Sequence, residues 1–144
     1  MVEFLHYLIN MNENKNLSRS QLNYLSGNIL GAAFKVHSQL GPGLLESVYE
    51  VCLKHEMNKK GIRNESQVAL PAYYDQMEIN IGYRVDFLVE NSILVELKSV
   101  EIINSLHEAQ LLTYLKLSGL KLGLLINFNV LSLKEGITRL VNQF

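Results

Sequence analysis

The chain has 144 residues, of which 48% are hydrophobic and 19% are charged, and its formal net charge is −1 at pH 7. This length fits one domain with a single core, and the composition excludes an intrinsically disordered chain. The near-zero charge excludes a protein that holds nucleic acid by long-range charge alone, because such proteins are usually clearly basic. The single cysteine excludes an intramolecular disulfide and a cysteine-based zinc site.

The first ten residues are apolar, but they lack the basic start and the small-residue cleavage site of a signal peptide. No stretch approaches the roughly 20 apolar residues of a membrane span. The sequence therefore predicts a cytoplasmic protein without a membrane segment. A polar stretch from Asn12 to Ser20 predicts an N-terminal extension over residues 1–21, with Met11 as an alternative start, and one domain over residues 22–144. The apolar N-terminus and the small size also suggest a homodimer.

Two helices are predicted at the start of the domain. Apolar residues at three- and four-residue spacing predict the first helix from Leu22 to Leu40, with Ser20 as its N-cap. Gly41-Pro42-Gly43 ends it. The second helix is predicted from about Leu44 to Lys60, where Gly61 stops it.

Two strands are predicted next, over residues 62–70 and 72–81, with Pro71 at an edge or bend between them. The following stretch, Tyr83 to Lys98, has the pattern of a β-hairpin with one apolar face. A three-residue connection pairs Val89 with Ile93, and only this register places the alternating apolar residues on one face. Burial therefore selects a shared face made of Val85, Phe87, Val89, Ile93, Val95 and Leu97.

The opposite face of the hairpin is predicted to carry the chemistry. In this register Asp86 lies directly opposite Glu96, with the two Cβ atoms about 5 Å apart. Such a pair destabilises the strands unless a cation lies between the acids or one of them is protonated. Lys98 supplies one positive charge, and a divalent ion would supply two. The same face also carries Arg84, Leu88 and Leu94.

The rest of the chain predicts a third helix over residues 105–118, ended by Gly119, and strands over residues 121–128 and 136–141. The strand at 121–128 is almost entirely apolar, which is typical of a strand covered on both faces. On the third helix, His107, Gln110 and Tyr114 form a polar line that could border the acids. The fold class is α/β or α+β, in the order α-α-β-β-β-β-α-β-β.

Several short motifs follow one another along the domain, and their order and spacing together are informative. They are Gly43-x-x-Glu46-x-x-Tyr49, Asp86, Glu96-Leu97-Lys98, and a helix that carries Gln110 and Tyr114. In this order and spacing, the chain resembles the GxxExxY family, a branch of the PD-(D/E)xK nuclease superfamily, from about Leu22 to Val141. One departure is that Arg84-Val85 precedes Asp86, where the superfamily name has a proline.

The resemblance implies a restriction-endonuclease-like mixed β-sheet flanked by helices, with a Mg²⁺ (or Mn²⁺) site on the hairpin. It implies that Asp86 and Glu96 bind the metal, with Glu46 completing the site and the Leu97 carbonyl as a further ligand. Lys98 is the lysine of the E-x-K element. Gln110 and Tyr114 are auxiliary residues, whereas Tyr49 is expected to be a packing residue with a satisfied hydroxyl.

The function predicted from these residues is metal-dependent hydrolysis of phosphodiester bonds in DNA or RNA by an activated water. Two alternatives stay open: a non-catalytic nucleic-acid-binding or regulatory module with the nuclease fold, and a structural subunit whose hairpin face is an interface. A further possibility is that the hairpin charges form only a surface ion network, in which Asp86 pairs with Arg84 or Lys98 and Glu96 pairs with Lys98.

Overall fold

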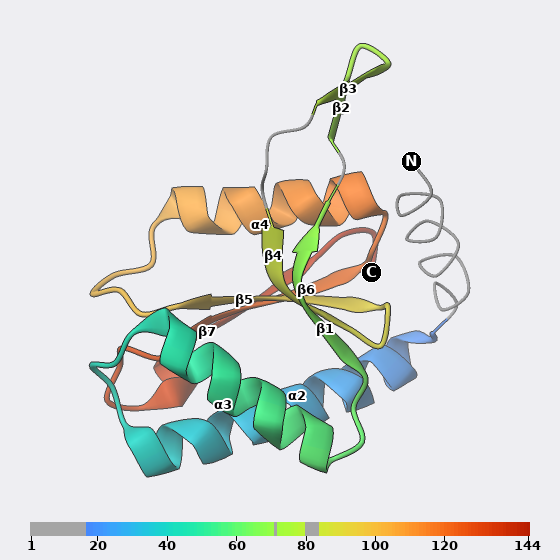
Figure 1. Cartoon of the computed structure of the whole chain (residues 1–144). Coiled ribbons are helices and arrows are strands. Elements are labelled where there is room, and N and C mark those ends of the chain that lie inside the picture. The colour runs from blue at the N-terminus through green and yellow to red at the C-terminus, as the bar shows by residue number, and fades with distance from the viewer. Residues whose placement is uncertain (1–16, 71, 80–83) are drawn as a thin grey trace.

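The protein is a three-layer structure in which helices cover both faces of one mixed sheet (Figure 1). The computed structural model describes residues 17–70, 72–79 and 84–144. Helices α2 (Arg19–Leu40) and α3 (Glu46–Lys59) lie on one face, and α4 (Ser105–Ser118) lies on the other. The predicted mixed sheet flanked by helices is confirmed.

The main sheet has five strands in the order β1-β4-β5-β6-β7. Strands β5 and β6 are parallel, with α4 in the connection between them, and the other neighbours are antiparallel. The strands of the chain are β1 (Asn64–Ala69), β2 (Ala72–Tyr74), β3 (Met77–Ile79), β4 (Arg84–Val89), β5 (Ile93–Lys98), β6 (Leu122–Asn127) and β7 (Ile137–Val141), and a short 3₁₀ helix η1 (Leu133–Gly136) precedes β7.

Each face of the sheet buries its own apolar cluster. The cluster under α2 and α3 includes Ile29, Leu53 and Phe128, and the cluster under α4 includes Leu111 and Leu115. Strand β6 lies between the two clusters and is buried along its whole length. This confirms the prediction that residues 121–128 form a strand covered on both faces.

The first helix begins earlier than predicted, at Arg19, and its N-cap is Ser18 rather than Ser20. The Ser18 hydroxyl accepts a hydrogen bond from the Gln21 amide, and the Gln21 side chain accepts one from the Ser18 amide. This reciprocal capping box needs a glutamine or glutamate three residues after the cap, which only Ser18 has. Residues 1–16 of the predicted extension, with Met11, lie outside the described residues.

The strand predicted over residues 72–81 is wrong, because this stretch forms the two-stranded hairpin β2–β3. Asp75 and Gln76 have φ values of 49° and 65°, and two successive left-handed residues reverse the chain in a two-residue turn. The hairpin projects away from the three layers (Figure 1). The described residues therefore contain one strand more than predicted. Pro71 and residues 80–83 lie outside the described residues.

The register predicted for the central hairpin is confirmed. Phe87 pairs with Val95 and Val89 with Ile93, and the turn takes left-handed φ values of 48° and 51° at Glu90 and Asn91. The prediction of a single apolar face is wrong, because α4 covers the second face and buries Leu88 and Leu94 there. Val85 joins this second cluster instead of the cluster of Phe87. The alternation of side chains between the two faces is interrupted at Asp86. Here the main-chain pairing of β4 and β5 ends, and the Asp86 and Glu96 carboxylates accept hydrogen bonds from the opposite strand instead.

Candidate active site

The G-x-x-E-x-x-Y motif builds the turn that starts α3. Tyr49 is fully buried and stacks on Phe128, with 4.4 Å between the ring centroids. Its hydroxyl donates to the Gly41 carbonyl (2.6 Å) and accepts from the Leu44 amide (3.2 Å), which confirms the predicted packing residue with a satisfied hydroxyl. We call these two hydrogen bonds of the Tyr49 hydroxyl the clamp. The clamp holds residues 41–45 out of the helix, so that α3 begins two residues later than predicted, with Glu46 in its first turn.

We expect Tyr49→Phe to lower the free energy of unfolding by about 1–2 kcal/mol, because the Gly41 carbonyl and the Leu44 amide lose their shared partner in two part-buried hydrogen bonds. Urea unfolding followed by circular dichroism measures the change. Tyr24→Phe is the matched control, because Tyr24 is 76% exposed, and its effect should stay within about 0.5 kcal/mol. Equal stability of the two variants would contradict the clamp.

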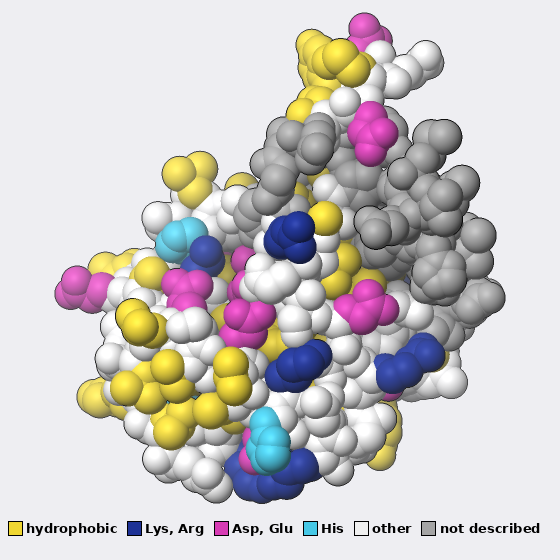
Figure 2. Space-filling model, viewed as in Figure 1, with side chains coloured by type: hydrophobic (Ala, Val, Ile, Leu, Met, Phe, Trp, Pro, Cys, Tyr) yellow, Lys and Arg dark blue, Asp and Glu magenta, His cyan; other side chains and the backbone are white. Residues whose placement is uncertain are grey.

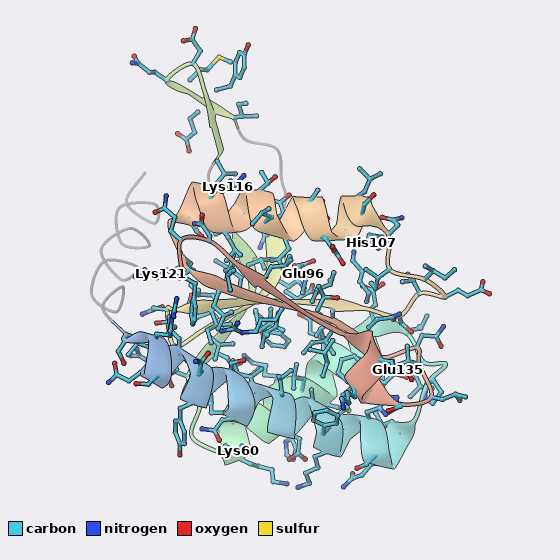
Figure 3. The ribbon with its side chains drawn as sticks, turned by 180° about the vertical axis from the view of Figure 1, so that it is seen from behind. Lys60, Glu96, His107, Lys116, Lys121 and Glu135 are labelled. Carbon is cyan, nitrogen blue, oxygen red and sulfur yellow. The ribbon has the colours of Figure 1, made fainter. Side chains whose placement is uncertain are left out.

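Asp86 and Glu96 lie on neighbouring strands just beyond Phe87 and Val95, the last paired residues of β4 and β5, so the direct pairing predicted for the two acids is not part of the ladder. Each carboxylate accepts a hydrogen bond from the main chain of the opposite strand: Glu96 Oε1 from the Asp86 amide (2.8 Å) and Asp86 Oδ2 from the Leu97 amide (2.7 Å). Glu96 is buried and lies in the interior beneath α4 (Figure 3). Donation from main-chain amides therefore holds the two acids in place where the strands part.

Acidic groups of α3 act on Asp86 from the other side. Burial raises the pKa of Asp86, and the charges of Glu50 and Glu46 raise it further, whereas hydrogen bonds from the Leu97 amide and from Gln67 oppose the rise. Gln67 Nε2 donates both to Asp86 Oδ1 (3.1 Å) and to Glu50 Oε1 (2.8 Å). Figure 2 shows several acidic side chains gathered on the face that carries α3 and β1. The site thus concentrates negative charge around Asp86.

This negative charge should lower the free energy of unfolding at neutral pH. Because the pKa of Asp86 is higher in the folded protein than in the unfolded chain, ionised Asp86 disfavours folding. We expect Asp86→Asn to raise the free energy of unfolding at pH 7 by about 1 kcal/mol. The gain should shrink as the pH falls through the folded pKa, where Asp86 of the natural chain takes up a proton.

Thermal unfolding between pH 3 and pH 8 measures this difference. The matched control is Asp75→Asn, which makes the same chemical change at an exposed turn position and should leave the thermal midpoint at pH 7 close to that of the natural chain. An Asp86→Asn protein less stable than the natural chain at pH 7 would show that the acid contributes net stability.

The structure does not show the alternative in which Asp86 forms an ion pair with Arg84 or Lys98. Arg84 donates to the Gln67 carbonyl (3.2 Å). The ion pairs between described side chains join Glu56 to Lys35 and Lys59, and Glu90 to Arg63. Within the described part of the chain, Asp86 therefore pairs with neither Arg84 nor Lys98. Lys98 is half-buried at the end of β5 and takes part in none of these pairs.

The three residues predicted to form a polar line on α4, His107, Gln110 and Tyr114, lie in three different environments. His107 Nδ1 accepts from the Asn104 amide (3.2 Å) and so caps the helix, at the end seen in Figure 3. Gln110 is exposed, and Tyr114 is buried in the cluster beneath α4 together with Leu111 and Leu115. Only Tyr114 of the two predicted auxiliary residues lies inside the protein.

Sequence reasoning missed three residues that shape the site. Glu50 and Gln67 contact Asp86 or act on its charge, as described above. Asn127 is buried at the end of β6, where its side chain donates to the Val100 carbonyl (2.9 Å) and accepts from the Val100 amide (3.1 Å). It thereby fixes the segment that follows Lys98. Glu50 could have been found, because it lies one helical turn after Glu46.

These residues offer the donor set of a hard divalent ion. Mg²⁺ and Mn²⁺ prefer carboxylate and carbonyl oxygens, and the carboxylates of Glu50 and Glu46 lie close enough to Asp86 to raise its pKa. The uncompensated charge around Asp86 is the kind that a cation would relieve, so the chemistry of these side chains suits the ion. No group of three or more His, Cys, Asp or Glu side chains ready to hold a metal occurs in the described part. The ligand set therefore stays a prediction.

A five-stranded mixed sheet between helices is consistent with a restriction-endonuclease-like fold. The family model of the PD-(D/E)XK nuclease superfamily matches residues 23–140. The chain therefore belongs to the PD-(D/E)XK nuclease superfamily, which suggests nuclease activity. Comparisons with curated proteins and with solved structures returned no match.

Proposed function

We propose that the protein is a nuclease that uses Mg²⁺ or Mn²⁺ to hydrolyse phosphodiester bonds in DNA or RNA. The observation that carries the proposal is the placement of Asp86 between Glu96 on β5 and the acids of α3, at the opening of the two strands. Membership in the superfamily supports the same chemistry. We further propose that the chain belongs to the GxxExxY branch; the turn before α3, which Tyr49 holds and after which Glu46 begins the helix, supports this proposal.

In this proposal Asp86, Glu96 and the Leu97 carbonyl hold the ion, and Glu46 completes its surroundings. A bound ion of this type polarises the phosphate and lowers the pKa of a bound water. The Lys98 ammonium, which takes part in no ion pair among the described side chains, can orient the attacking water or stabilise negative charge on the phosphate. Gln110, which is exposed on α4, and Tyr114, which is buried beneath it, are the auxiliary residues of this proposal.

A cleavage assay tests the proposal. The protein is incubated with plasmid, single-stranded DNA and RNA, with Mg²⁺, Mn²⁺ or a chelator. We expect cleavage of at least one substrate with metal and none after chelation. Glu96→Ala and Lys98→Ala should lose this activity, whereas Glu135→Ala and Lys134→Ala, which make the same changes at exposed positions, should keep it. Cleavage that survives both site substitutions would come from another site or a contaminant.

The main alternative is a nucleic-acid-binding or regulatory module that keeps the fold without turnover. The formal net charge of −1 favours this function over a nuclease that captures DNA by charge alone. The same samples separate the two functions. Stabilisation by metal and binding of nucleic acid without any cleavage would support the module.

The remaining proposals concern the location, the partner and the assembly of the protein. No helix within the described residues is both long enough and apolar enough to cross a membrane. We propose the cytoplasm as its location, nucleic acid as its partner and a homodimer as its assembly. Light scattering at several protein concentrations tests the dimer directly.

A further inference from the structure

Gln67 lies in the candidate site but has no role in the chemistry proposed above. It is on β1, between residues that pair with Phe87 and Val85 of β4, and so lies beside Asp86. Its φ of 54° is left-handed, which is uncommon for a residue other than glycine, asparagine or aspartate. Such a conformation carries an energetic cost and persists only where the surrounding structure imposes it.

The side chain of Gln67 bonds to both α3 and β4. Its Nε2 donates to Asp86 Oδ1 (3.1 Å) and to Glu50 Oε1 (2.8 Å), so both hydrogens of the amide are used. Arg84 holds the Gln67 carbonyl from the other side (3.2 Å). No described residue donates a hydrogen bond to the side-chain oxygen of Gln67. One nitrogen atom therefore stands between two carboxylates that come from different elements.

A neutral amide holds these carboxylates without cancelling their charge. The ion pairs between described side chains include neither Glu50 nor Asp86, and Glu46 adds a third negative charge near Asp86. A lysine at position 67 would neutralise one acid and occupy the space permanently. A glutamine leaves the negative charge in place and can be displaced by a stronger partner, because its bonds to the carboxylates are not ion pairs.

We propose that Gln67 is a positioning residue that holds the Asp86 and Glu50 carboxylates ready for the divalent ion and gives way when the ion binds. This inference rests on the proposed function, and it adds Gln67 and Glu50 to the residues that determine metal affinity. Preorganisation of this kind improves binding, because the acids need not be brought together when the ion arrives. Residues that orient metal ligands commonly change metal affinity 10–100-fold when they are replaced.

Calorimetric titration of the full chain with Mn²⁺ tests the proposal in the natural chain, Gln67→Met, Glu50→Gln and the double variant. We expect Gln67→Met to weaken Mn²⁺ binding about tenfold. Glu50→Gln should weaken binding in the natural chain but add little in the Gln67→Met background, because Glu50 is then no longer held at the site. Gln76→Met is the matched control, since it removes the same amide from another left-handed position, with φ 65°, on the projecting hairpin. It should bind Mn²⁺ as the natural chain does.

The outcomes separate this proposal from the proposed function. If Mn²⁺ binding is lost in Asp86→Asn but Gln67→Met binds as tightly as Gln76→Met, or if the effects of Gln67→Met and Glu50→Gln simply add, the role of Gln67 is overturned and the metal site stands. If the natural chain binds no Mn²⁺, both are overturned. Should Gln67→Met fail to fold, Gln67→Asn takes its place, because asparagine tolerates a left-handed backbone and is too short to reach both carboxylates.

Discussion

Asp86→Asn should reduce phosphodiester cleavage by about a thousandfold while leaving the protein folded and slightly more stable at pH 7. The activity falls because the neutral amide supplies only one oxygen, carries no charge and cannot hold the ion as the carboxylate would. The fold survives because asparagine keeps an oxygen for the Leu97 amide (2.7 Å in the natural chain). The opposite signs of the two effects are typical of a residue retained for function at a cost to stability.

Initial rates of cleavage under saturating Mn²⁺, together with the thermal midpoint of each variant, measure both effects. Asp75→Asn is again the matched control, because it changes the same group on the projecting hairpin, away from Asp86. A variant at position 86 that cleaves at the natural rate would contradict the assignment of Asp86 as a ligand. Loss of activity together with loss of folding would instead place Asp86 among the structural residues.

Gly136→Ala should have the largest effect on stability, a loss of roughly 3 kcal/mol. A Cβ atom at this position in η1 would collide with the main-chain carbonyl oxygen of Asn127 and would also press on Val130. The main chain cannot rotate away from the added Cβ atom as a flexible side chain could. The displaced Asn127 is the residue that binds the main chain of Val100, so the segment after Lys98 should move as well.

Gly27→Ala provides the control for Gly136→Ala. Gly27 lies within α2, and an added Cβ would meet no atom within 4 Å. Alanine is the better helix former, so this change should stabilise the protein by about 0.5–1 kcal/mol. Urea unfolding of both variants measures the contrast. A Gly136→Ala protein as stable as the natural chain would show that η1 can shift without cost.

The sequence predicted those parts of the fold that depend on short-range patterns. The register of β4 and β5 follows from the period of two and a three-residue connection, and both are local. Helix α4 begins and ends at the predicted residues, because Asn104 caps its first turn and Gly119 adopts the left-handed conformation that ends helices, with φ 69°. The β2–β3 turn escaped prediction because Asp75-Gln76 is a weak turn sequence compared with Asn-Gly or Asp-Gly.

The site itself could be predicted only in part. The neighbouring positions of Asp86 and Glu96 follow from the register of β4 and β5, but the two-sided burial of the hairpin depends on how α4 packs against the sheet. The part played by Gln67 depends on which strand pairs with β4 and on a left-handed φ that nothing in the residue type signals. Contacts between distant elements therefore carry the information that local patterns lack.

The position of a bound ion tests the central claim most directly. Crystals of the protein grown with Mn²⁺ locate the ion by its anomalous scattering. The proposed function predicts one ion within bonding distance of the Asp86 carboxylate, with Glu96 or the Leu97 carbonyl as a further ligand, and none at this place in Asp86→Asn crystals. An ion bound elsewhere, or the same ion retained after the substitution, would contradict a metal-dependent site at the opening of β4 and β5.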